Sequence, residues 1–139
     1  MGRILAIDFG TKRTGLAVTD PLRIMANGLE TVPTKDLMPY LEKYVTSEQV
    51  DVVVLGLPTQ MNGADSQTMQ EIRAFGANFQ KKFPAIELVY VDERFTSVLA
   101  HRTMLEAGLK KKARQDKALV DKISATIILQ SYLETLNDT

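Results

Sequence analysis

The sequence predicts one domain of the α/β class, a mixed five-stranded sheet with helices on both faces, in the order β-β-β-α-β-α-β-α-α. Near the N-terminus, three apolar stretches are joined by short polar connections, which is typical of an antiparallel meander. After them, apolar strands alternate with segments of helical spacing, and helical crossovers connect parallel strands. A chain of 139 residues suits one domain that buries about two thirds of its unfolded surface.

Each expected strand is a short apolar run closed by a polar or turn-forming residue. The first ends at Asp8, the second at the turn Asp20-Pro21, and the third at Pro33. The fourth is almost unbroken apolar, which favours the middle of the sheet, and the fifth leads into Asp92. The strands are expected at residues 4–7, 14–19, 24–32, 50–56 and 86–91.

The helices are expected from apolar residues three and four apart and from capping residues. Asp36 can cap the first helix, and Asp65 or Ser66 the second. The aromatic residues of the second helix form one stripe, which is more typical of a core than of a ligand site. We expect the helices at residues 36–45, 66–83, 96–108 and 118–136, with a basic connector at 110–117.

Composition restricts the chemistry. The chain has no cysteine, which excludes disulfides, thiolate zinc sites and cysteine nucleophiles, and its one histidine, His101, cannot build a multi-histidine metal site. A metal would therefore be a hard cation on carboxylates, Mg²⁺ or Mn²⁺. The N-terminus enters a strand at once and no apolar run approaches membrane-spanning length. We expect a cytoplasmic location and no membrane partner.

Charge is unevenly distributed although the net charge is zero. Residues 94–122 contain eight basic and three acidic side chains. This segment could bind a phosphate backbone, but a solvated loop has the same composition.

The turn after the first strand combines Thr11, Lys12 and Arg13 between Gly10 and Gly15. The glycines suggest backbone freedom, and the two cations and the hydroxyl could hold an anion or a metal-phosphate pair. The alternative is an ordinary hairpin in which Asp8 accepts hydrogen bonds from its own turn.

Three carboxylates stand in otherwise apolar surroundings: Asp8, Glu93 and Asp121. Small residues near Asp121 would let its helix approach the strand ends, and three carboxylates meeting there would require a cation between them. Such a cluster can hold Mg²⁺ ions for phosphodiester hydrolysis, with Lys12, Arg13 or Arg94 neutralising the phosphate. Singly, however, Glu93 could form a surface ion pair, Asp92 could cap a helix, and Asp121 could bond a backbone amide.

Four segments resemble the YqgF family, also called RuvX, whose members are described as Holliday junction resolvases or pre-16S rRNA nucleases. They are Ala6-Ile7-Asp8-Phe9-Gly10-Thr11-Lys12-Arg13-Thr14-Gly15-Leu16-Ala17, Gly56-Leu57-Pro58 with Asn62-Gly63, Val91-Asp92-Glu93-Arg94-Phe95-Thr96-Ser97, and Asp121-Lys122-Ile123-Ser124-Ala125 with Ile127-Ile128-Leu129-Gln130. The resemblance implies a ribonuclease H-like fold and a metal-dependent nuclease site. By motif position, Asp8, Glu93 and Asp121 match the family's acidic residues.

The chain departs from related resolvases at the end of the fourth strand. Those resolvases place an acidic residue there, whereas this sequence has Gly56-Leu57-Pro58. Asp92 is a candidate for the missing metal ligand. The following loop, with Asn62, is a candidate contact for the substrate backbone, and His101 is expected on a helix surface rather than as a base.

The resemblance implies a nuclease acting on structured RNA, namely the trimming of the 5′ end of the pre-16S ribosomal RNA, with ribosomal precursor particles as partners. The same site could cut branched DNA. An alternative is a binding module that uses the basic connector, with Lys110, Lys111, Lys112 and Arg114 contacting nucleic acid. Handling of nucleotide phosphates is a third reading, which the short chain disfavours. We expect a monomer, since trimming one RNA end needs no second copy.

Overall fold

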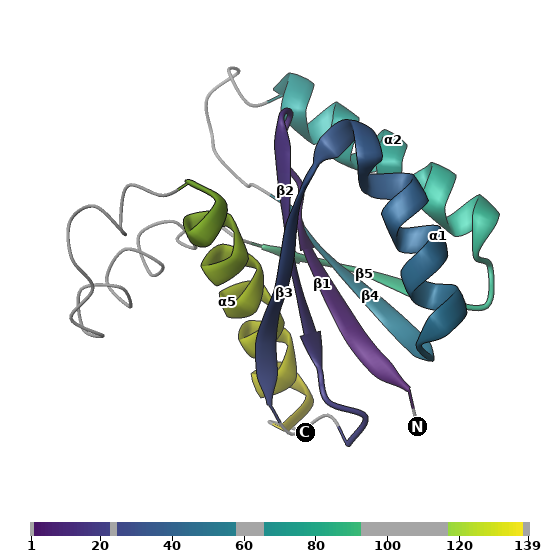
Figure 1. The fold of residues 1–139 in the computed structure, drawn as a ribbon, viewed down its shortest axis with the longest axis vertical. Coiled ribbons are helices and arrows are strands. Elements are labelled where there is room, and N and C mark those ends of the chain that lie inside the picture. The colour runs from purple at the N-terminus through teal and green to yellow at the C-terminus, as the bar shows by residue number, and fades with distance from the viewer. Residues whose placement is uncertain (1, 23–24, 58–65, 93–116, 138–139) are drawn as a thin grey trace.

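A sheet lies between helix layers in the computed structural model, which describes residues 2–22, 25–57, 66–92 and 117–137 (Figure 1). Helix α5 covers one face of the sheet, and α1 and α2 cover the other. The elements are β1 (Arg3–Asp8), β2 (Arg13–Thr19), β3 (Ala26–Pro33), the 3-10 helix η1 (Thr34–Asp36), α1 (Leu37–Ser47), β4 (Val50–Leu57), α2 (Ser66–Lys82), β5 (Glu87–Asp92) and α5 (Lys117–Asn137).

The strand order is β3-β2-β1-β4-β5. Strands β1, β2 and β3 form an antiparallel meander, whereas β1, β4 and β5 run parallel to one another. This confirms the mixed five-stranded sheet and the meander at one edge. Strand β4 lies between β1 and β5, in agreement with its nearly continuous apolar sequence.

The three parallel strands end at the same edge of the sheet. Ile7 of β1 pairs with Leu55 of β4, and Leu57 of β4 pairs with Asp92 of β5. Asp8, the last residue of β1, therefore lies at the edge where β4 and β5 also end. In open α/β sheets, ligands bind outside the carboxyl ends of the strands.

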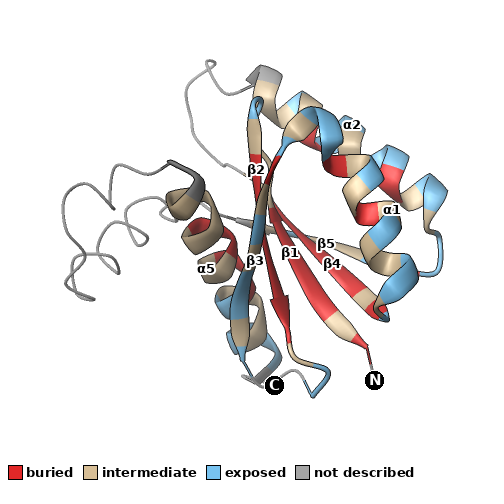
Figure 2. Ribbon diagram, in the orientation of Figure 1, coloured by how far each residue is buried: buried red, intermediate tan, exposed pale blue. Residues whose placement is uncertain are grey.

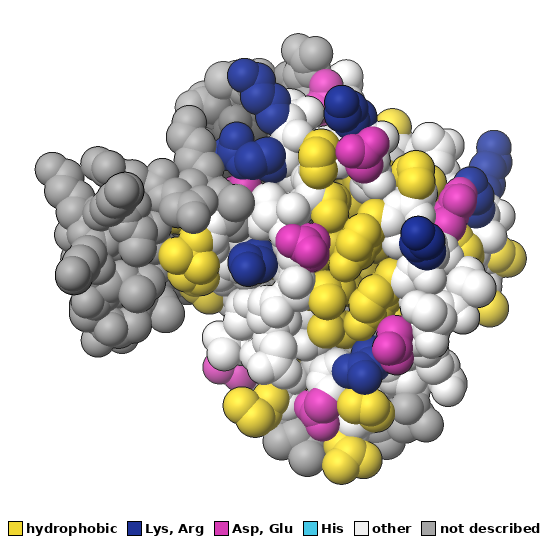
Figure 3. Space-filling model, in the orientation of Figure 1, with side chains coloured by type: hydrophobic (Ala, Val, Ile, Leu, Met, Phe, Trp, Pro, Cys, Tyr) yellow, Lys and Arg dark blue, Asp and Glu magenta, His cyan; other side chains and the backbone are white. Residues whose placement is uncertain are grey.

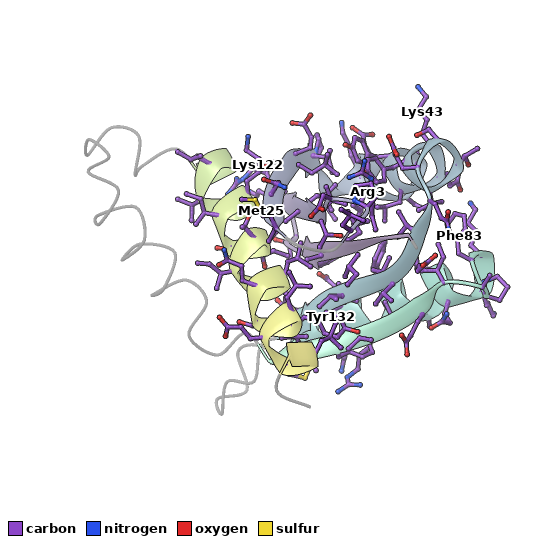
Figure 4. All side chains as sticks on the ribbon, turned by 90° about the horizontal axis from the view of Figure 1, so that it is seen from below. Arg3, Met25, Lys43, Phe83, Lys122 and Tyr132 are labelled. Atoms are coloured by element: carbon purple, nitrogen blue, oxygen red, sulfur yellow. The ribbon has the colours of Figure 1, made fainter. Side chains whose placement is uncertain are left out.

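Strand alternation divides the core into two clusters, one on each face of the sheet. Figure 2 shows buried residues along the central strands and on the sides of the helices that face them. On the α5 face, Ile4 and Ala6 pack with Ile128 and other residues of α5. On the opposite face, Leu5 and Ile7 belong to the cluster that α1 and α2 cover. The stick view in Figure 4 shows side chains on both sides of the sheet, with α5 apart from the other two helices.

The stripe of aromatic residues on α2 belongs to the core, as expected. Phe79 is completely buried, and its ring lies 5.0 Å from that of Phe83 and 6.2 Å from that of Phe75. Gly76, which follows Phe75 in the sequence, packs closely against the hydroxyl of Tyr90 on β5.

Element boundaries differ from expectation by a few residues. Strand β2 begins at Arg13 rather than residue 14, and β3 begins at Ala26 rather than residue 24. Asp36 does precede α1, but within the described chain its carboxylate makes no capping hydrogen bond, because η1 leads directly into the helix. The predicted helix at 96–108 and residues 110–116 of the predicted connector lie outside the described residues, and its last residue, Lys117, is the first residue of α5. No helix in the described ranges is long and apolar enough to cross a membrane.

Candidate active site

Asp8 lies on the α5 face of the sheet. It continues the alternation of Ile4 and Ala6, which both pack in the α5 cluster, and its side chain is half-buried. Across the antiparallel β1–β2 pair, its partner is Gly15. A glycine opposite a carboxylate presents no side chain to cover it.

Helix α5 packs tightly against the sheet at Gly15. A Cβ atom built on Gly15 would overlap the carbonyl group of Asp121 and lie only 3.0 Å from the Cβ of Asp121. Directly paired strand residues have Cβ atoms about 4.5–5.5 Å apart, so the Cβ atoms of Asp8 and Asp121 are separated by at most about 8.5 Å. The structure thus brings together two carboxylates that are far apart in the sequence.

Small side chains on α5 permit this approach. Ser124 and Ala125, one turn after Asp121, are both buried against the sheet. Gly15 was expected to border the polar turn, and it lies inside β2, in agreement with the strand expected at residues 14–19. Its function is to let a helix backbone pack against a strand. A glycine within an otherwise apolar strand is a signal of such close approach.

Asp121 is paired with Arg13. The Nε of Arg13 donates a hydrogen bond of 2.9 Å to Oδ2 of Asp121, and the arginine and aspartate side chains are 40% and 22% exposed, respectively. The partner of Asp121 in this pair is therefore a cation from the predicted anion-binding turn. The ion pair also ties β2 to α5.

The turn between β1 and β2 is fixed by η1 on one side and by α2 on the other. The Thr34 hydroxyl donates a 2.5 Å hydrogen bond to the carbonyl of Gly10, and the Thr34 amide donates to the carbonyl of Lys12 at 3.0 Å. The Thr34 hydroxyl also lies 2.9 Å from that of buried Thr14. The ring of Phe9 lies 5.5 Å from that of Phe75 on α2. These contacts hold the segment that carries Asp8 and Arg13, and Thr34's role could not be predicted from the sequence.

The donor set fits Mg²⁺ or Mn²⁺. Both cations prefer carboxylate oxygens, and the seating of the Arg13 guanidinium on Asp121 shows that positive charge is accommodated at this position. Within the described residues, no group of three or more acidic, histidine or cysteine side chains could hold a metal. A site that also required Glu93 would extend beyond the described chain.

The other predicted site residues divide into two groups. Lys12 is exposed in the turn after β1, and Asp92 ends β5 in register with Leu57. Leu57 itself packs against the cluster on the α1 and α2 face. The remaining candidates lie outside the described residues: Asn62, Glu93, Arg94, Lys110, Lys111, Lys112 and Arg114.

A second surface feature lies on α1, on the opposite side of the sheet from Asp121. An open hollow of about 820 Å³ is bordered by Tyr40 and Lys43 among other residues of α1. Figure 3 shows hydrophobic side chains gathered over this side of the molecule, with charges of both signs around them, and Figure 4 shows Lys43 extending into solvent. Burial raises the pKa of Tyr40, with Glu30 adding to the shift, and burial also raises that of Tyr44. The mixed charges and the distance from both carboxylates make this hollow a poor candidate for phosphodiester chemistry.

Known proteins match the chain along almost its whole length. The family model described as "RuvX: Holliday junction resolvase" matches residues 2–135. A Bacteroides fragilis protein named "Putative pre-16S rRNA nuclease" is 62% identical over 135 residues, which cover 97% of this chain and 98% of the relative. A Porphyromonas gingivalis protein of the same name is 60% identical over 134 residues, covering 96% of this chain and 97% of the relative.

Solved structures agree on the fold. Thermus thermophilus RuvC in complex with a Holliday junction substrate aligns with a TM-score of 0.59 at 17% identity, covering 98% of this chain and 96% of that one. A second structure of Thermus thermophilus RuvC aligns with a TM-score of 0.58. The expected ribonuclease H-like fold is therefore confirmed. The family model and the relatives together show that this chain belongs to the RuvX family.

Proposed function

We propose that this protein is a divalent-metal-dependent nuclease that hydrolyses phosphodiester bonds in structured RNA, and that its substrate is the 5′ end of the pre-16S ribosomal RNA. The observation that carries the proposal is the meeting of Asp8 and Asp121 at the edge where the parallel strands end. The names of the relatives support the RNA substrate.

Each described residue of the site has a distinct role in this proposal. Asp8 and Asp121 supply carboxylate oxygens that would hold Mg²⁺ or Mn²⁺. A divalent cation held by these carboxylates would supply Lewis-acid activation of water and stabilisation of the leaving oxygen of the phosphodiester. Arg13 and Lys12 provide positive charge for the substrate phosphates. The hairpin contacts of Thr34 and Phe9 keep this arrangement in place before substrate arrives.

We expect Glu93, rather than Asp92, to complete the acidic cluster. By motif position, Glu93 matches an acidic residue of the family, and in the sequence it directly follows Asp92, the last residue of β5. Gly56 on β4 supplies no carboxylate, so the chain needs its further ligand from the segment after β5.

The choice between RNA and branched DNA depends on groups beyond the carboxylates. A carboxylate-bound metal acts on phosphorus and does not distinguish sugars, whereas selection for RNA requires a contact to the 2′-hydroxyl. The matching family model is described as a Holliday junction resolvase, which supports the alternative that the substrate is branched DNA. We propose that the protein acts on ribosomal precursor particles as a monomer in the cytoplasm. A stable dimer in sedimentation would favour the junction alternative.

The test is cleavage by purified protein of a 5′-extended 16S precursor fragment and of a four-way DNA junction, each with Mg²⁺, with Mn²⁺ and with chelator. Asp8→Asn and Asp121→Asn remove one carboxylate each. Glu134→Gln is the matched control, because it neutralises an exposed carboxylate near the other end of the same helix. We expect cleavage of the RNA that requires metal, survives in Glu134→Gln and falls by at least about a hundredfold in both aspartate variants.

Other outcomes would change the conclusion. Metal-dependent cutting of the junction alone would replace RNA with branched DNA as the substrate. Cutting that does not depend on Asp8 or Asp121 would show that the site lies elsewhere or that the activity is a contaminant. Binding of RNA without any cleavage, lost on neutralising Lys110, Lys111 and Lys112, would favour a binding module.

A further inference from the structure

Arg13 is placed to contact both carboxylates of the site. It is the first residue of β2 and stands two positions before Gly15, on the same face of the sheet. Since Gly15 is the cross-strand partner of Asp8, Arg13 is a diagonal neighbour of Asp8, about 7–8 Å away along the face and within reach of a long side chain. Its Nε is bound to Asp121.

Arg13 is bound to an oxygen of Asp121 that would coordinate a metal ion. Arg13 donates to Oδ2 of Asp121 at 2.9 Å, and a cation coordinated to the same oxygen would place two positive charges side by side. Like charges in contact repel, so binding of the two cations to Asp121 is competitive. The Arg13 side chain is 40% exposed and is therefore able to rotate away from the helix.

The geometry points to Arg13 as a place-holder cation. It holds Asp121 in position while no metal is bound, and binding of a divalent cation releases its guanidinium toward the substrate phosphate. This inference rests on the metal site of the proposed function. Because binding couplings are reciprocal, Arg13 must weaken metal binding by the same factor by which metal weakens the Arg13–Asp121 pair. Arg13 is thus a positioning residue for Asp121, and metal loading makes it available to RNA.

The first test measures Mn²⁺ binding by calorimetry in the full-length protein without nucleic acid. Arg13→Gln should bind Mn²⁺ about two- to fivefold more tightly than the wild type, the range expected for loss of a partly exposed ion pair. Arg13→Lys retains the charge and should remain closer to the wild type. Lys12→Gln is the matched control, because it removes the same charge from the neighbouring residue. The Lys12 side chain is exposed, and among the described residues the ion pair of Asp121 is with Arg13.

The second test follows the Nε–H signal of Arg13 by NMR during titration with Mg²⁺. In the metal-free protein this proton donates to Asp121 and should exchange slowly with water, and at saturating Mg²⁺ it should lose that protection. An unchanged signal at saturation would overturn the inference. Tighter binding of equal size in Lys12→Gln would also overturn it, because general electrostatics would then account for the effect.

Failure of the inference can be distinguished from failure of the proposed function. If the wild type binds Mn²⁺ and Asp121→Asn does not, the metal site stands, and the Arg13 results alone decide the place-holder role. If the wild type binds no Mn²⁺, or Asp121→Asn binds it as tightly, both the metal site and the place-holder role are wrong.

Discussion

Gly15→Ala tests the packing that brings the two carboxylates together. The substitution adds one methyl group where a Cβ would overlap the carbonyl of Asp121 and lie 3.0 Å from its Cβ. Gly15 lies within a paired strand, so the obstacle is space rather than backbone conformation. The atoms it meets belong largely to the helix backbone, which cannot rotate away as a flexible side chain would.

The size of the effect follows from this overlap. A Cβ on Gly15 would lie 2.1 Å from the Asp121 carbonyl oxygen, so restoring an ordinary contact of about 3.5 Å requires α5 to move by about 1.4 Å near Asp121. Overpacking of this kind costs about 1–3 kcal/mol, because buried neighbours such as Ala125, Ile128 and Leu129 must shift with the helix. For a chain of this length the cost corresponds to a fall in Tm of roughly 3–10 °C. If Asp121 has the proposed role in the site, displacing its carboxylate by about 1 Å or more should lower cleavage about a hundredfold.

Gly28→Ala is the matched control. Gly28 lies on β3 beneath the same helix, but a Cβ there would lie 3.6 Å from the Thr126 hydroxyl and 3.7 Å from the Cβ of Lys122, which are ordinary contacts. We expect it to change stability by less than about 0.5 kcal/mol and to leave cleavage intact. Thermal unfolding and the metal-dependent RNA cleavage assay measure both variants. Wild-type stability and cleavage in Gly15→Ala would refute the packing of α5 on β2 described above.

Further predictions concern the hairpin and the tyrosines of α1. Thr34→Val removes the hydroxyl that donates to Gly10 and leaves the buried Thr14 hydroxyl without this contact, so chemical denaturation should show a loss of about 1–3 kcal/mol. Thr46→Val, whose exposed hydroxyl bonds only within α1 in the described structure, should change little, and equal losses would contradict the role of Thr34. Because burial raises the pKa of Tyr40 and of Tyr44, the folded state holds their protons more tightly than the unfolded state. Their stabilising effect is therefore complete below pH 10 and disappears as the pH rises above it, so Tyr40→Phe with Tyr44→Phe should lessen alkaline destabilisation in denaturation curves measured from pH 9 to 12.

The sequence predicted the elements well where local chemistry determines them. The apolar run before Asp8 and the unbroken apolar strand at residues 50–56 both form strands at the expected positions, and the latter lies inside the sheet as predicted. The stripe of α2 and the length of α5 were likewise readable from side-chain spacing. Expectations for residues 93–116, including Glu93 and the basic connector, lie outside the described structure and stay predictions.

The sequence failed where a residue acts through a distant partner. Gly15 follows the polar segment at residues 11–14, and its contact with Asp121 could not be predicted from its neighbours in the sequence. Thr34 gave no signal, because a threonine between Pro33 and Lys35 is unremarkable until the hairpin folds against it.

The sequence by itself determined the strand pattern, the carboxylate at the end of β1 and the family resemblance, and its lack of cysteine led us to expect Mg²⁺ or Mn²⁺ rather than softer metals. Only the tertiary structure decided that Asp121 faces Arg13, 108 positions away along the chain, and that Gly15 admits the helix beside Asp8. The physical reason is that spacing along a chain fixes which face of an element a residue occupies, whereas contacts between elements depend on how closely their backbones can pack.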